Sequence, residues 1–172
     1  MIGLIVEDSS DERAVREICK KLNIETEFRR MRGNDLKKAK RFADLLFSEG
    51  CKNVIVLKDL HSFEPSALKT RFAQTGFEQQ AKLCIVVRAI EAWLLSDEKA
   101  LGDYLGSEVK RVHEPEAIEK PNQILDKLFN KKKGRPYLKG GEDPAEIAKR
   151  LRLQVVERKC GSFKEFRETV QN

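Results

Sequence analysis

The sequence has few of the residues that structural metal sites and disulfide frameworks require. Its 172 residues include four cysteines and two histidines, and no two cysteines form a CxxC pair. A structural zinc site needs four clustered sulfur or nitrogen ligands, so the sequence argues against one. We expect all four cysteines to be reduced thiols, with Cys19 and Cys84 in the core.

Long hydrophobic runs are also missing. The longest covers residues 83–87, which is far short of the ~18 residues that span a bilayer. Residues 1–4 lead directly into a strand pattern, without the basic and apolar segments of a signal peptide. We therefore expect a cytoplasmic protein with no membrane partner.

Charge is unevenly distributed along the chain. Residues 1–108 contain 18 basic and 18 acidic residues, whereas residues 109–172 contain 16 basic and 10 acidic residues and carry the whole net charge of +6. A basic C-terminal part fits nucleic acid or another phosphate-rich polyanion as partner. It fits a solvated surface as well, and composition does not decide between the two.

Short apolar segments alternate with helical periodicity as far as residue 106. The spacing predicts strands over residues 2–6, 24–30, 53–57 and 82–87, with the second half-exposed and near an edge. Helices are predicted over residues 10–22, 35–49, 66–74, 89–95 and 97–105, and Ser9 with Glu12 forms a capping-box pattern. Gly33-Asn34 breaks the chain. The alternation predicts an α/β fold with a mainly parallel, Rossmann-like sheet flanked by helices.

The composition changes after Gly106. Prolines separate short helical segments at residues 121–129, 144–151 and 163–170, while residues 153–156 could form one further strand. Residues 130–135 have the composition of a flexible basic loop. We therefore divide the chain into an α/β core over residues 1–106 and a helical, basic C-terminal extension over residues 107–172, packed on that core.

Each of three buried strands is followed by a carboxylate: Glu7, Asp59 and Glu91. Ligands of open parallel sheets bind beyond the carboxyl ends of the strands, and Mg²⁺ prefers oxygen ligands. The three side chains are therefore candidates for one metal site. A carboxylate after a strand can also stabilise a helix N-terminus, which could explain Asp59 or Asp8, and Glu91 could instead pair with Arg88.

Two families share this pattern. Residues 4–9, Leu-Ile-Val-Glu-Asp-Ser, resemble the start of a response-regulator receiver domain, which implies Asp59 as a phospho-acceptor. That resemblance is short, because Arg88-Ala89 stand where a receiver needs Ser or Thr, and no fifth strand ending in lysine is recognisable.

A longer resemblance runs over nearly the whole chain. Val6-Glu7 with Asp11-Glu12, the segment VIVLKD at residues 54–59 and the segment RAIEAWLLSD at residues 88–97 are similar to TOPRIM-like proteins of a poorly characterised bacterial and archaeal family. The resemblance implies a parallel four-strand core with a Glu/Asp site for Mg²⁺ or Mn²⁺. In topoisomerases, primases and OLD-type nucleases, that fold makes or breaks phosphodiester bonds.

This chain departs from the TOPRIM pattern at one metal ligand. His61 stands where the second aspartate of the Asp-x-Asp motif is expected. Imidazole is a softer ligand than carboxylate and suits Mg²⁺ poorly. The site would then accept Mn²⁺, use Glu91 instead, or have lost catalysis.

The main hypothesis is a small TOPRIM-type nuclease with a metal at Glu7, Asp59 and His61, and with Glu91 or Glu7 in proton transfer. One alternative is a non-catalytic nucleic-acid or nucleotide-binding module on the same fold, and another is a receiver-like phospho-switch. The nucleic-acid contacts predicted in the basic segment are phosphate contacts and one aromatic stacking contact: Lys131, Lys132, Lys133, Arg135, Lys139 and Tyr137. Trp93, at helical spacing with leucines, is expected in the core.

Overall fold

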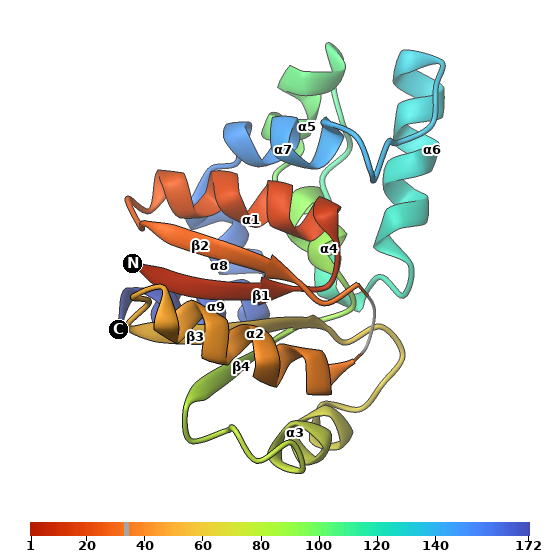
Figure 1. Ribbon diagram of the computed structural model, residues 1–172. Coiled ribbons are helices and arrows are strands. Elements are labelled where there is room, and N and C mark those ends of the chain that lie inside the picture. Colours follow the sequence, from red (N-terminus) through yellow and green to blue (C-terminus); the bar gives the residue numbers. More distant parts are fainter. Residues whose placement is uncertain (33–34) are drawn as a thin grey trace.

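The computed structural model describes residues 1–32 and 35–172. Its four described strands form one parallel sheet in the order β2-β1-β3-β4 (Figure 1). The strands are β1 (Ile2–Val6), β2 (Thr26–Arg30), β3 (Asn53–Asp59) and β4 (Ala81–Val86). The predicted α/β fold is confirmed, and β2 lies at an edge of the sheet. The chain break predicted at Gly33-Asn34 lies outside the described residues.

Helices cover both faces of the sheet (Figure 1). They are α1 (Ser9–Lys21), α2 (Leu36–Ser48), α3 (Pro65–Ala73), α4 (Ile90–Leu95), α5 (Glu98–Leu105), α6 (Pro121–Lys133), α7 (Asp143–Arg150), α8 (Leu153–Lys159) and α9 (Gly161–Gln171), with a short 3-10 turn at Pro115–Ala117. Side chains alternate along each strand. Ile55 and Leu57 therefore pack with α1 and the C-terminal helices, whereas Val54 and Val56 pack with α2 and the end of α3.

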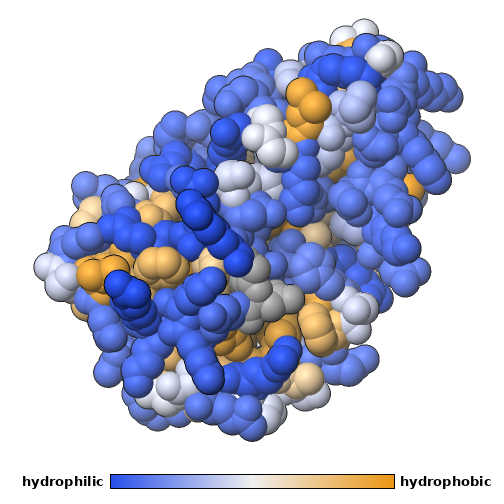
Figure 2. Space-filling view, turned by 45° about the vertical axis from the view of Figure 1, so that its right-hand side comes forward, coloured by the Kyte–Doolittle hydropathy of each residue, from blue (hydrophilic) through white to orange (hydrophobic). Residues whose placement is uncertain are grey.

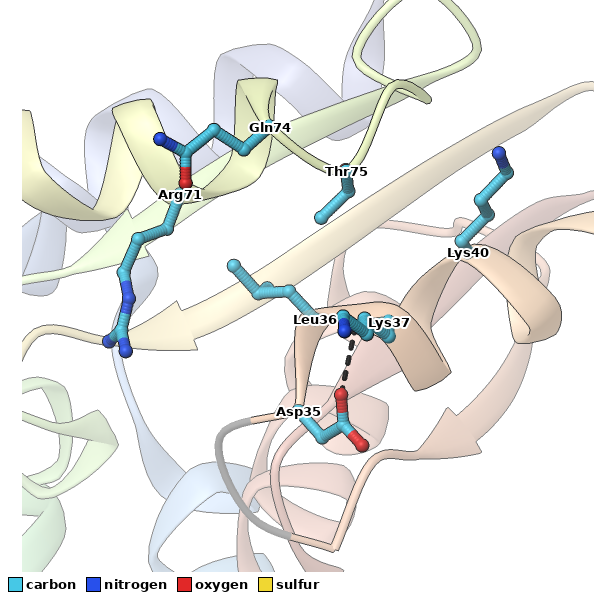
Figure 3. Close-up of a pocket in the computed structure, with 7 residues that line it drawn as sticks. All are labelled: Asp35, Leu36, Lys37, Lys40, Arg71, Gln74 and Thr75. Carbon is cyan, nitrogen blue, oxygen red and sulfur yellow. Dashed lines mark hydrogen bonds between the residues drawn. The ribbon is translucent and has the colours of Figure 1, made fainter.

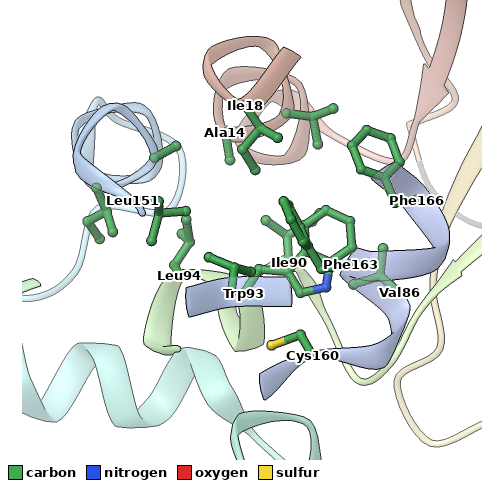
Figure 4. Packing of buried hydrophobic residues seen from close by; sticks show 14 of the residues in the cluster. Ala14, Ile18, Val86, Ile90, Trp93, Leu94, Leu151, Cys160, Phe163 and Phe166 are labelled. Atoms are coloured by element: carbon green, nitrogen blue, oxygen red, sulfur yellow. The ribbon is translucent and has the colours of Figure 1, made fainter. Parts of the chain in front are cut away.

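One hydrophobic cluster joins residues from before and after residue 106. Trp93 of α4 is fully buried and lies beside Phe163 and Phe166 of α9, with ring centroids 5.1 and 5.4 Å away (Figure 4). Its indole N–H donates to Ser162 Oγ at 2.9 Å. The predicted core position of Trp93 is confirmed, and the buried N–H has the partner that an interior polar group needs.

Two predictions for the C-terminal part are wrong. Residues 153–156 belong to helix α8, because Leu153 and Val156, three residues apart, share its buried face. Residues 130–133 form the last turn of α6, which ends at Gly134 in the left-handed conformation with φ 65°. Residues 130–133 are therefore helical, and residues 130–135 do not form the predicted loop. No helix within residues 1–32 and 35–172 combines the length and apolar character needed to cross a membrane.

Candidate functional site

The carboxyl edge of the sheet brings together residues from β1 and β3. Glu7 follows β1, and its Oε1 accepts hydrogen bonds from the Lys58 ammonium and from the Asp59 backbone N–H, the latter at 3.0 Å. His61 lies just beyond β3, with its Nε2 3.6 Å from Glu7 Oε2. The structure thus places Glu7, Asp59 and His61 side by side, as their positions after the strands predict.

Helix α1 contributes two further carboxylates. Asp8 is its N-cap and accepts hydrogen bonds from the backbone N–H groups of Ser10 and Asp11 at 2.8 and 3.2 Å, while Asp11 accepts from the Asp8 N–H at 3.3 Å. This capping box replaces the predicted pair of Ser9 and Glu12, because the helix begins one residue earlier. The helix-capping alternative for Asp8 is therefore confirmed.

Lys139 connects the α1 side of this region to α4. Its Nζ lies 3.5 Å from Asp8 Oδ2 and 3.5 Å from Glu91 Oε1. Glu91 is only 1% exposed. Its ion-pair partner is Lys139, and not Arg88 as the alternative interpretation of the sequence proposed. We call Glu7, Asp8, Asp11, Asp59 and Glu91 the acidic cluster.

Electrostatic interactions within the acidic cluster are unbalanced. Burial, followed by the charges of Asp11, Glu7 and Glu91, raises the pKa of Asp59 well above its usual value. Burial and the neighbouring Asp8 likewise raise the pKa of Asp11 to about 7. Burial lowers the pKa of Lys139, but the surrounding carboxylates outweigh burial, and the net shift is upward. Such shifts mean that the cluster favours additional positive charge or protons.

Three buried polar atoms near this edge have no hydrogen-bond partner in the described part of the chain. They are Arg88 Nε, Glu91 Oε2 and Tyr137 Oη. Burial, followed by the charges of Glu91 and other carboxylates, raises the pKa of Tyr137 well above its usual value, which places its hydroxyl near the acidic cluster. Unsatisfied buried polar atoms are uncommon and often mark positions that bind a ligand or ion.

The donor set of the acidic cluster suits a hard divalent cation, since it consists of carboxylate oxygens. The orphaned Oε2 of Glu91 also offers an acceptor to such an ion. However, across residues 1–32 and 35–172 no three His, Cys, Asp or Glu side chains are positioned to hold a metal ion together. The ammonium groups of Lys58 and Lys139 lie against the carboxylates that a cation would contact.

The structure separates the residues predicted to bind nucleic acid. Lys131 and Lys133 are exposed at the end of α6, and the Lys133 ammonium lies 4.3 Å from the centre of the Tyr104 ring. Arg135 makes a two-pronged ion pair with Asp143, with both N–O distances 2.7 Å. The Arg135 side chain therefore has a structural role.

Tyr137 and Lys139 also differ from the prediction. Tyr137 is buried, with its ring 5.4 Å from that of Phe129, so it does not present a face on which a base could stack. Lys139 lies in the acidic cluster. Of the predicted set, only Lys131, Lys132 and Lys133 remain together on one segment. Most of the face seen in Figure 2 is hydrophilic, with hydrophobic side chains in separate spots.

Two hollows are relevant to ligand binding. One, of about 560 Å³, lies between α2 and α3 and is lined by Lys37, Lys40 and Arg71 among others (Figure 3). Arg71 and Lys40 point away from one another, so their charges do not converge on one ligand. The other, of about 280 Å³, adjoins the acidic cluster and is lined by His61, Arg88, Glu91 and Lys139, among others.

Asp11 is part of the motif on which the TOPRIM resemblance rests, but it was not predicted as a site residue, although its signal is present. Asp11 stands four residues before Val15 and seven before Ile18, which places all three on the buried face of α1. A carboxylate on an apolar face requires a partner or a ligand. The role of Lys139 had no comparable signal, because its contacts with Asp8 and Glu91 join distant parts of the chain.

Fold and site together define an α/β protein with a parallel sheet and a partly buried acidic cluster at the carboxyl edge of that sheet. The chain belongs to the family described as a domain of unknown function, DUF4276, whose model matches residues 6–171. Neither the curated proteins nor the solved structures contain a match to the chain.

Proposed function

We propose that this protein is a small, divalent-metal-dependent nuclease of TOPRIM type that acts on the phosphodiester bonds of nucleic acid. One observation carries the proposal: five carboxylates converge at the carboxyl edge of the sheet, against the ammonium groups of Lys58 and Lys139. Burial, followed by the neighbouring carboxylates, raises the pKa values of Asp11 and Asp59 there. Groups of neighbouring buried carboxylates with perturbed pKa values are typical of sites that bind a cation or transfer protons.

The arrangement of the sheet supports the TOPRIM resemblance. A four-stranded parallel sheet with a glutamate directly after β1 and an aspartate at the end of β3 is what that resemblance implies. Both carboxylates project at the edge where open α/β sheets bind their ligands. This support is by analogy of fold, so the chemistry has to be tested on the residues themselves.

The residues would act as follows. Glu7, Asp59 and either His61 or Glu91 would hold Mg²⁺ or Mn²⁺. Their side chains would have to rearrange to do so, together with the lysines paired with Glu7 and Glu91, because the described positions do not bring three such ligands together. A metal held there would polarise a phosphoryl oxygen and activate a water molecule. Glu91, buried and with one oxygen unpartnered, is placed to accept a proton. The lysines at the end of α6 would attract the polyanion.

The test is cleavage of labelled DNA and RNA by the full chain in Mn²⁺, in Mg²⁺ and in EDTA. We expect metal-dependent cleavage that Asp59→Asn and Glu7→Gln reduce by about a hundredfold or more, as loss of a key electrostatic contact does. Glu78→Gln, an exposed carboxylate just before β4, is the matched control and should cleave normally. Equal cleavage by all three variants would trace the activity to another source and overturn the proposal.

A second candidate is a non-catalytic nucleic-acid or nucleotide-binding module. It is favoured by the buried Lys58, 1% exposed, whose ammonium pairs with the glutamate that would hold the metal. His61 in place of an aspartate favours it too. Metal-independent binding of nucleic acid, with no cleavage in either metal, would select this candidate.

A further inference from the structure

The pocket of about 280 Å³ beside the acidic cluster is formed by separate segments of the chain. His61 comes from the connection after β3, and Arg88 comes from the connection between β4 and α4. Glu91 lies in the first turn of α4, and Lys120 immediately precedes α6. Lys139, from the connection between α6 and α7, completes the lining. The pocket and the acidic cluster share Glu91, and Lys139 touches both, so a ligand in the pocket would lie directly against the cluster.

The backbone around this pocket is held in an unusual conformation. His61 and Arg88 both have positive φ angles, 51° and 66°, which non-glycine residues adopt infrequently. Two hydrogen bonds lock them together: the His61 N–H donates to the Arg88 carbonyl at 2.8 Å, and Arg88 Nη1 donates to the His61 carbonyl at 3.2 Å. Strained residues that the surroundings hold in place are concentrated at binding and catalytic sites.

Two polar groups at the pocket lack partners in the described residues. Arg88 Nε is buried without an acceptor, and Glu91 Oε2 is buried without a donor. In addition, α6 begins at the pocket, and its N-cap residue Lys120 makes no side-chain capping bond. The pocket is therefore lined by the side chain of Arg88, whose Nε is buried without an acceptor, and it lies at the positive end of the thirteen-residue helix α6.

We propose that this pocket binds one phosphate group of a nucleic-acid backbone, with Arg88 as its principal anchor and Lys120 and the start of α6 as additional contacts. The inference rests on the proposed function in that it names the substrate position for the same site. Arg88, Lys120 and Lys139 outnumber the carboxylates Glu91 and Glu119 in the lining. A planar guanidinium recognises phosphate oxygens in pairs, which suits the anchoring role.

The size and position of the pocket favour a backbone phosphate over a larger ligand. A volume of about 280 Å³ is at or below the lower end of the range for small-molecule sites. Because the pocket opens beside the acidic cluster, a phosphate there would lie next to a cation held by the carboxylates. Glu91, common to both, would be screened from the phosphate by Lys139 or by that cation.

The test is fluorescence anisotropy with a short, labelled single-stranded oligonucleotide in EDTA, so that binding is measured without any metal. Arg88→Asn removes the guanidinium but keeps a residue that tolerates positive φ. We expect it to weaken binding about tenfold, as loss of one charge-assisted interaction does. Lys120→Gln, at an exposed position, should weaken binding severalfold. Lys52→Gln, which removes one charge at the opposite, amino edge of the sheet, is the control and should change affinity less than about twofold.

Competition distinguishes the possible sources of the phosphate. Inorganic phosphate and a mononucleotide should displace the oligonucleotide only at concentrations far above those of an unlabelled oligonucleotide. If either competes as well as the oligonucleotide, the ligand is a free phosphate compound and the backbone assignment is wrong. If Arg88→Asn and Lys120→Gln bind the oligonucleotide with the same affinity as Lys52→Gln, the pocket does not bind phosphate and the proposal is wrong. Absence of cleavage with binding retained would refute the nuclease and leave the pocket intact.

Discussion

Asp97 and Asp143, in the helical part of the chain, are as deeply buried as Asp11 and Asp59 at the edge of the sheet. Their exposed fractions are 0% and 1%, against 3% for each of the other two. The surroundings differ. Asp97 accepts hydrogen bonds from the Arg152 guanidinium and backbone, and Asp143 accepts from both terminal nitrogens of Arg135. The carboxylates at the sheet edge lie close to one another instead.

The pKa values follow from these surroundings. Burial alone would raise the pKa of Asp97, but the hydrogen bonds from Arg152 outweigh it, and the pKa is lowered. Asp143 behaves in the same way beside Arg135, whereas the pKa values of Asp11 and Asp59 are raised. Burial therefore does not distinguish Asp97 and Asp143 from Asp11 and Asp59. The presence or absence of a hydrogen-bonded arginine does.

The largest effect should come from removing a paired aspartate. Asp97→Ala deletes the N-cap of α5 and leaves the Arg152 guanidinium without its partner. We expect the free energy of unfolding to fall by about 3 kcal/mol or more, measured by urea denaturation. Asp103→Ala, an exposed carboxylate of the same helix paired with Lys99, is the control and should cost less than about 1 kcal/mol. An equal loss of stability in the two variants would show that the buried pair of Asp97 and Arg152 does not stabilise the fold more than an exposed ion pair.

Neutralising an aspartate of the acidic cluster should have the opposite sign. Asp59→Asn in EDTA should raise the free energy of unfolding at neutral pH, because it removes a carboxylate whose charged form burial and three neighbouring carboxylates disfavour. Thermal melts should then show that Mn²⁺ stabilises the unmodified chain more than this variant. A decrease in stability in EDTA would mean that Asp59 belongs to a structural ion pair, like Asp97.

The contributions of Asp11 and Asp97 to stability should also depend on pH in opposite directions. The pKa of Asp11 is about 7 in the folded chain and ordinary in the unfolded one, so its contribution to stability is fully present in acid and is lost as pH rises through about 7. The contribution of Asp97 is present above its unfolded pKa and is lost as pH falls through its lower, folded value.

Urea denaturation in EDTA at a series of pH values would measure this. The free energy of unfolding of the unmodified chain should increase by on the order of 1 kcal/mol from about pH 8 to about pH 6. In Asp11→Asn most of this increase should be absent, whereas in Asp97→Asn it should be unchanged. If Asp11→Asn shows an unchanged pH dependence, Asp11 does not titrate in that range.

The sequence predicted the fold well because the relevant signals are local. Runs such as residues 53–57 mark buried strands through their apolar, β-branched composition, and the topology then places Glu7 and Asp59 at one edge. Residues 153–156 were assigned wrongly because a run of four residues satisfies strand and helix patterns equally. Tertiary contacts of Leu153 and Val156 decide for the helix.

The site could be predicted only in part, because several of its contacts are tertiary. Whether Glu91 pairs with Arg88 or Lys139 depends on the path of the chain between α6 and α7, which no local pattern encodes. The same path buries Tyr137 and directs Arg135 to Asp143. The basic segment looked uniform in sequence, yet its members have three different environments.

The smallest effect on stability should come from the three lysines at the end of α6, in contrast to Arg135, which follows them in the same segment. Arg135 is paired with a buried aspartate, so Arg135→Ala should destabilise the fold by about 3 kcal/mol. Replacing Lys131, Lys132 and Lys133 together by Ala should change stability by less than about 1 kcal/mol, because alanine favours the helix and the lysines are largely solvated.

If these lysines bind phosphates, the slope of log affinity against log salt should decrease by roughly one unit for each lysine–phosphate interaction removed, for single strands and duplexes alike. Anisotropy titrations at several salt concentrations would measure the slope, with Lys52→Gln as the control for a charge far from α6. An unchanged slope in the triple variant would assign the end of α6 to the solvated surface, and the nucleic-acid contacts would then have to lie at the pocket of Arg88 and Lys120 alone.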